Sequence, residues 1–257
     1  MVRSAIGLPC TVLLSPASAG LAVSENHMER RDFIAGSIGA AALALFTTAA
    51  HGASPSTGLL PLPRRQRIRV AFLLGDRANV IDTAGPWEVF QDTMVDGEHP
   101  HPFELYTVGP SQDVLTMTGG LKVQPHYAIA NAPEPNVIVV PAQKATDATR
   151  AWLRVMSAKT DVTLSVCTGA FQLAKAGLLD GVPATTHHDF WDQFAKEFPE
   201  IELRRGLRFV DSGRIATAGG LTSGIDMALH IVARYFGTDT AARTAQYMEY
   251  SSEAWRS

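Results

Sequence analysis

Short apolar runs alternate with amphipathic segments from about residue 68 to the end of the chain. Each run ends at a glycine, a proline or a polar turn, which is typical of buried strands. The expected strands are residues 69–74, 103–108, 137–140 and 162–166, with a hairpin of 209–211 and 215–217. The expected helices are residues 147–158, 168–176, 189–198, 223–236 and 238–250. Strands that alternate with helices predict one α/β domain with a doubly wound sheet.

Two of the expected helices carry specific start signals. Pro86 is followed by Trp-Glu-Val-Phe, and proline is well tolerated in a first helical turn, so a further helix is expected to open at Pro86. Ser223 precedes the clearest apolar repeat and can cap the free amides of that helix, with Asp226 three residues further on. Gly237 supplies the stop signal of the same helix.

The first part of the chain does not follow this pattern. Residues 28–53 read as a charged start, a short apolar stretch and small residues, which together describe a signal peptide. The pair Arg30-Arg31 makes this segment similar to a twin-arginine export signal. The alternative is a membrane anchor, but the apolar run is shorter than the roughly 20 residues that span a bilayer and contains Gly and Ser.

We therefore expect the chain to be organised in four parts. Residues 1–27 are interpreted as an over-extended start, 28–53 as a cleaved leader, 54–67 as a linker and 68–257 as the folded domain. This organisation predicts export to the periplasm without stable membrane insertion, or a cytoplasmic protein if the signal is not used.

Composition narrows the functional class. The 257 residues are 46% hydrophobic and 18% charged, which is ordinary for a globular protein, and the net charge of −3 argues against a nucleic-acid partner. The two cysteines, Cys10 and Cys167, are too few for a disulfide scaffold.

The chemistry centres on Cys167. This residue lies where a predicted strand runs directly into a predicted helix, and Ser165-x-Cys167-x-Gly169 keeps the small residues of a nucleophile elbow. Free amides at a helix N-terminus stabilise a thiolate, so we expect a lowered pKa and a nucleophilic role. The alternative interpretation is an inert buried cysteine.

Several motifs make the chain similar to a known superfamily. Ser-Val-Cys-Thr-Gly-Ala at 165–170, followed by 173–181 and by the Ala-Thr-Thr-His that ends at His187, resembles the ThiJ/PfpI superfamily. Residues 80–89, 217–226 and 246–250 resemble its isonitrile hydratase branch. The resemblance implies a flavodoxin-like, mostly parallel three-layer α/β/α sandwich related to class I glutamine amidotransferases.

The resemblance also implies residue roles. Cys167 matches the nucleophile, and Thr168 falls where the hydratase branch has an essential threonine and PfpI-type peptidases have a histidine. Asp82 matches an acidic residue that approaches the cysteine from the loop after the first strand, where it could bind the thiol or activate water. An Asx turn or cap before the Pro86 helix would also explain Asp82.

Further residues are expected to form the substrate pocket and oxyanion site. His187 either promotes thiolate formation or is a pocket-wall histidine, while Gly219 and Gly220 either let the backbone approach the pocket or form a tight turn. Gly85 belongs to the same expected pocket. Ala142 stands where relatives have a glycine pair whose N–H points toward the thiol, and an alanine there is penalised if the turn needs a positive φ.

No metal or organic cofactor is expected. His187 is followed by His188, but the pair lacks the spaced third ligand that a zinc site would require.

The resemblance favours a cysteine-dependent hydro-lyase that converts an isonitrile to an N-substituted formamide through a thioimidate. The alternative is a non-catalytic ligand-binding or redox-sensing module, related to the sensor domains of AraC-type regulators but without their DNA-binding part. Both interpretations imply a small-molecule ligand, and relatives commonly form homodimers.

Overall fold

The computed structural model describes residues 59–60, 67–96 and 100–257. The interpreted start 1–27 and leader 28–53 lie outside these residues. Within the predicted linker, Leu60 donates its N–H to the Arg234 carbonyl at 2.6 Å and packs against the core. None of the helices in the described ranges is both long enough and apolar enough to span a bilayer.

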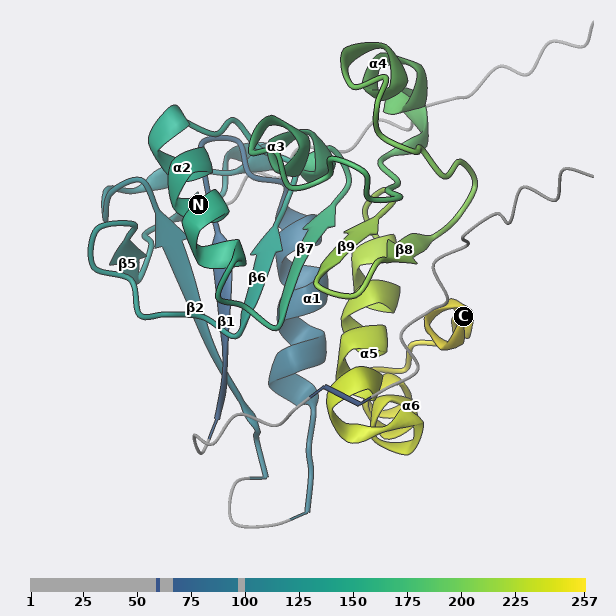
Figure 1. The fold of residues 1–257 in the computed structure, drawn as a ribbon. Helices are drawn as coiled ribbons and strands as arrows, with labels where there is room; N and C mark the ends of the chain where they lie inside the picture. The colour runs from purple at the N-terminus through teal and green to yellow at the C-terminus, as the bar shows by residue number, and fades with distance from the viewer. Residues whose placement is uncertain (1–58, 61–66, 97–99) are drawn as a thin grey trace, which may run out of the picture. The chain divides into compact units, whose positions relative to one another are not determined.

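A seven-stranded sheet runs through the domain in the order β5-β2-β1-β6-β7-β9-β8 (Figure 1). All neighbouring strands are parallel except the β8–β9 pair, which forms the predicted hairpin. The strands are β1 Ile68–Leu73, β2 Phe103–Gly109, β5 Tyr127–Ala128, β6 Val137–Val140, β7 Val162–Val166, β8 Phe209–Asp211 and β9 Ile215–Ala218. A separate two-stranded ladder of β3 Leu115–Thr116 and β4 Lys122–Val123 was not predicted.

Helices cover both faces of the sheet. The side chains of α1, α5 and α6 pack on one face, and those of α2, α3 and α4 pack on the other. The helices are α1 Val80–Asp92, α2 Asp147–Ser157, α3 Gly169–Lys175, α4 Trp191–Glu197, α5 Ser223–Phe236 and α6 Thr238–Tyr247, with 3₁₀ turns η1 Thr118–Gly120, η2 His188–Phe190 and η3 Ala254–Arg256. The predicted mostly parallel α/β sandwich is confirmed.

Alternation along the central strands creates two separate cores. In β1, Val70 and Phe72 face the α1/α5 layer, while Ala71 and Leu73 face the α2/α3 layer. Because successive side chains of a strand point to opposite faces, an apolar run that is buried on both sides fills both cores.

The start of α1 differs from the prediction. The helix begins at Val80, and the Asn79 side chain accepts the N–H groups of Ile81 and Asp82. Pro86 therefore lies inside the helix rather than in its first turn. Proline inside a helix removes one backbone hydrogen bond, and the asparagine cap about two turns earlier was the stronger start signal.

The start of α5 is predicted at the right residue for the wrong reason. Thr222 occupies the N-cap position, and no side chain makes a capping hydrogen bond there. Ser223 is the first helical residue, and Asp226 pairs with Arg208 instead of completing a capping box.

The last helix is shorter than the predicted range 238–250. It stops at Tyr247, because Glu249 adopts a left-handed φ of 52°.

Candidate active site

Cys167 lies at the carboxyl end of β7, between that strand and α3. Its φ of 58° is in the left-handed region, which non-glycine residues adopt at a cost. Its N–H lies 2.6 Å from the Gly219 carbonyl, and its own carbonyl accepts the Thr186 hydroxyl at 2.9 Å. These hydrogen bonds hold the strained turn, so the structure contains the predicted nucleophile elbow.

Gly169 is required by the close approach of α3 to β6. A Cβ on this residue would lie 2.1 Å from the Val140 carbonyl oxygen, far inside the van der Waals limit. The glycine of the elbow pattern therefore leaves room for the backbone at the end of β6. This close approach keeps Cys167 near the end of that strand.

Asp82 is brought beside Cys167 by the first turn of α1, not by a loop. The side chain is fully buried, and its Oδ2 accepts the Ala142 N–H at 3.1 Å. The capping role belongs to Asn79, so the alternative of an Asx cap at Asp82 is wrong. Burial raises the pKa of Asp82 from 3.8 to about 7, although the Ala142 N–H, the Cys167 thiol and the Leu221 N–H all lower it.

The thiol of Cys167 is also harder to ionise than a free cysteine. Burial is the main cause that raises its pKa from 9.0 to about 11, and the neighbouring Asp82 charge adds to it. The N–H groups of Thr168 and Leu221 and the Thr168 hydroxyl act in the opposite direction. The predicted lowering by the helix N-terminus is therefore outweighed by desolvation and by a like charge.

The two side chains form a coupled acid–base pair. Because the pKa of Asp82 is far below that of Cys167, the first proton to leave the pair comes from the carboxyl group. Above about pH 7 a neutral thiol faces a carboxylate that can accept its proton. This arrangement suits a cysteine that is deprotonated only as it attacks an electrophile.

Ala142 does not have the expected geometry. It does not have a positive φ, so alanine is not penalised at this turn. Its N–H is donated to Asp82 rather than directed at the thiol, and it positions the base. The neighbouring Gln143 donates to the Leu73 carbonyl at 2.9 Å and accepts the Gly75 N–H, which ties its side chain to the end of β1.

Leu221 affects the Cys167–Asp82 pair, and the sequence did not reveal it. Its N–H lowers the pKa of both Asp82 and Cys167, and the residue has a left-handed φ of 52°. A glycine would have indicated such a left-handed turn, whereas a leucine gives no such signal.

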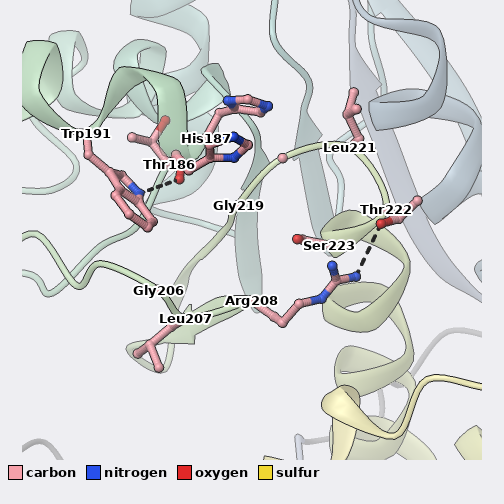
Figure 2. A pocket seen from close by; sticks show the side chains of 12 residues that line it. Thr186, His187, Trp191, Gly206, Leu207, Arg208, Gly219, Leu221, Thr222 and Ser223 are labelled. Atoms are coloured by element: carbon pink, nitrogen blue, oxygen red, sulfur yellow. Dashed lines mark hydrogen bonds between the residues drawn. The ribbon is translucent and has the colours of Figure 1, made fainter. Parts of the chain in front are cut away.

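A cavity of about 380 Å³ opens beside the turn that contains Leu221 (Figure 2). Its walls come from the segment that leads into α4, the segment before β8, and the stretch that joins β9 to α5. The lining includes His187, Trp191, Leu207, Arg208, Gly220 and Ser223. The Trp191 indole N–H is held by the Thr186 carbonyl at 3.0 Å, so one wall is fixed directly to the residue that supports Cys167.

His187 is a wall residue of this cavity. The His187 ring lies directly against the backbone of Gly220. A Cβ on Gly220 would be only 2.2 Å from the ring, so a glycine is needed at this position. Gly219 lines the same cavity. No hydrogen bond or ion pair within the described part of the chain joins His187 to Cys167, and its Nδ1 accepts the Asp189 N–H at 3.2 Å.

Two further expectations are corrected. Gly85 packs α1 against α5, because a Cβ there would lie 2.9 Å from the Ile225 side chain, and Gly85 is not among the residues that line the 380 Å³ cavity. The pair His187-His188 does have a third potential ligand beside it, because Asp189 lies next to both rings.

Comparison with known families agrees with this geometry. The model of the DJ-1/PfpI family matches residues 68–234, which include every strand of the main sheet and the elbow. This chain belongs to the DJ-1/PfpI family.

Individual members of the family differ in function. The chain is 30% identical over 190 residues to the isonitrile hydratase of Pseudomonas putida, covering 72% of this chain and 79% of that protein. It is 25% identical over 197 residues to the HTH-type transcriptional regulator GbdR of Pseudomonas aeruginosa, but this match covers 74% of the chain and only 53% of the regulator. The crystal structure of a ThiJ/PfpI family protein from Pseudomonas syringae superimposes with a TM-score of 0.65 at 26% identity, covering 79% of this chain and 84% of that one.

Proposed function

We propose that this DJ-1/PfpI family member hydrates an isonitrile to an N-substituted formamide. The observation that carries the proposal is the Cys167–Asp82 pair, in which a neutral thiol faces a buried carboxylate of elevated pKa. Similarity to an isonitrile hydratase over most of both chains supports the choice of substrate class.

The first half of the reaction forms a covalent intermediate. The Cys167 sulfur attacks the terminal carbon of the isonitrile while Asp82 takes the thiol proton. Asp82 then returns this proton to the same carbon, which gives a thioimidate with a C–H bond and leaves Asp82 as a carboxylate. A base with a pKa near neutrality is suited to both transfers.

The second half consumes one water molecule. Asp82 removes a proton from water as the oxygen attacks the thioimidate carbon, and this proton passes to the substrate nitrogen. Collapse of the resulting adduct breaks the C–S bond, and the hydroxyl proton returns to the sulfur through Asp82. The sum is isonitrile plus water to formamide, with the enzyme unchanged.

The groups around the sulfur can stabilise the charge that develops during these steps. The Thr168 hydroxyl and the N–H groups of Thr168 and Leu221 interact with Cys167 and favour its anionic form. Donors fixed in advance by the backbone are effective because they do not reorganise during the reaction.

The test is to incubate the purified protein and its C167A, D82N and T168A variants with a panel of isonitriles and to detect formamide by NMR. We expect turnover by the wild type, none by C167A or D82N, and reduced turnover by T168A. The wild-type kcat/KM should rise with pH through about 7, since the reaction requires the Asp82 carboxylate. Full activity of C167A, or a rate independent of pH across this range, would contradict the mechanism.

The second candidate is a ligand-binding module. It is favoured by the match to GbdR, a regulator of which this chain spans about half the length. If no isonitrile is turned over by any variant but small molecules raise the melting temperature of the wild type and of C167A equally, the binding role replaces the enzymatic one.

A further inference from the structure

We propose that His187, His188 and Asp189 form a binding site for a divalent transition-metal ion, such as Zn²⁺ or Cu²⁺, at the rim of the cavity. The three residues are consecutive, and one potential ligand atom from each lies within 4.8 Å of the other two. The site uses neither Cys167 nor Asp82, so it is independent of the proposed reaction.

The distances between the ligand atoms suit a metal ion. His187 Nδ1 lies 3.8 Å from one oxygen of Asp189, and His188 Nε2 lies 3.1 Å from the other. Ligands bound to zinc at about 2.1 Å in a tetrahedral arrangement are roughly 3.4 Å apart. Because the two imidazole rings are stacked, their nitrogen lone pairs lie in nearly parallel planes, and the exposed His188 ring must turn out of the stack to share an ion with His187.

One ligand is held in place while the other two can adjust. The His187 side chain is only 15% exposed, because it is packed on Gly220 and edge-on to Phe190. The side chains of His188 and Asp189 are 67% and 68% exposed, and the two histidine rings stack with centroids 4.4 Å apart. An ion would replace the Asp189 N–H that His187 Nδ1 now accepts at 3.2 Å.

The charges near the cluster do not oppose a cation. Asp189 supplies a negative charge to the two imidazoles. Arg208, on the opposite wall of the cavity, is paired with the buried carboxylate of Asp226, and Arg205 is paired with Asp192 at 2.7 Å. The positive charges of these two arginines are thus compensated by their own partners.

The two imidazoles favour zinc, copper or nickel over calcium and magnesium, which prefer ligand sets made of oxygen atoms alone. Three protein ligands leave at least one coordination position for water or for a small ligand. Because His187 and His188 both line the cavity, that position can be reached by a molecule that occupies it.

The experiment measures Zn²⁺ and Cu²⁺ binding to the metal-stripped full chain by isothermal titration calorimetry, with electron paramagnetic resonance of the Cu²⁺ sample. The variants are H188Q and D189N, and the matched control is H101Q, which changes an exposed histidine elsewhere on the domain. Circular dichroism checks that each variant is folded.

We expect one saturable site with nitrogen hyperfine coupling from histidine. H188Q and D189N should each weaken binding about tenfold or more, and H101Q should leave it unchanged. Absence of saturable binding, or equal affinity in all the folded variants, would overturn the site. Neither result depends on isonitrile turnover, so this proposal and the proposed function can fail separately.

Discussion

Asp82 and Cys167 control each other's protonation because the first turn of α1 and the turn after β7 bury the two side chains beside each other. The carboxylate makes the thiol harder to ionise, and the thiol in turn favours the charged form of the carboxylate. The identities of both residues were predictable from the sequence. Their pKa values were not, because desolvation depends on which elements cover the side chains.

The pKa of Asp82 has a consequence for stability. Since its folded-state pKa of about 7 lies above the ordinary 3.8, the folded protein binds this proton more tightly than the unfolded chain does. The stabilising contribution is therefore complete below about pH 4 and is lost as pH rises through about 7. The D82N variant has no such loss, since asparagine does not titrate.

We expect the stability of D82N relative to the wild type to increase by about 2–3 kcal/mol between pH 5 and pH 8. Urea denaturation of both proteins at the two pH values measures this difference. The C167A variant, measured in the same way, shows how much of the pH dependence comes from the thiol beside Asp82. An identical difference at pH 5 and pH 8 would show that Asp82 is not desolvated in the folded protein.

Among the elements, α5 links the edge strand β8 to η3 near residue 257. His230 Nε2 lies 2.9 Å from Asp211 of β8, and its Nδ1 lies 3.1 Å from the Trp255 carbonyl of η3. Arg234, one turn further on, also contacts Asp211 and donates to the Gly213 carbonyl at 2.8 Å. Burial raises the pKa of Asp211, but the hydrogen bond from His230, the charge of Arg234 and the Gly213 N–H together bring that pKa below its ordinary value.

We expect the H230L variant to unfold about 1–3 kcal/mol more easily, because it removes two hydrogen bonds and leaves the buried Asp211 with fewer partners. Release of η3 should also expose Trp255, which is 1% exposed, and make the C-terminal segment sensitive to protease. Thermal denaturation and limited proteolysis test this, with H188Q as the exposed-histidine control. Unchanged stability would mean that the apolar packing of Trp255 alone holds η3.

Element boundaries show what sequence patterns resolve. The apolar runs identified β1, β2, β6 and β7 because strands buried on both faces are short and rich in apolar residues. The starts of α1 and α5 were assigned to Pro86 and to a Ser223 cap, and the structure places Asn79 and Thr222 there. The choice among neighbouring capping residues depends on tertiary contacts such as the Asp226–Arg208 pair, which sequence spacing does not indicate.

For the whole molecule, the family and the sandwich fold were predictable because the elbow, the Asp82 segment and the glycine pair form one consistent set of motifs. The cavity was not predictable, since its walls come from three separate segments that only the folded sheet brings together. The same is true of Gly85, whose small size serves helix packing rather than the pocket.

Export by a twin-arginine signal at 28–53 remains a prediction. We expect the full chain to reach the periplasm of a bacterial host and the R30K/R31K variant to stay in the cytoplasm, because the paired arginines are the feature that resembles such signals. Cell fractionation and immunoblotting measure the distribution. Export of both proteins to the same extent would show that the arginine pair is not read as a signal.

The lengths of the outer strands affect how the protein behaves at high concentration. One border of the sheet is β5, with two residues, and the other is β8, with three. Unpaired backbone groups on a long border strand can recruit a strand from another molecule and start fibril growth. Borders this short offer few such groups, so the sheet is a poor template for self-association even though its interior strands are strongly apolar.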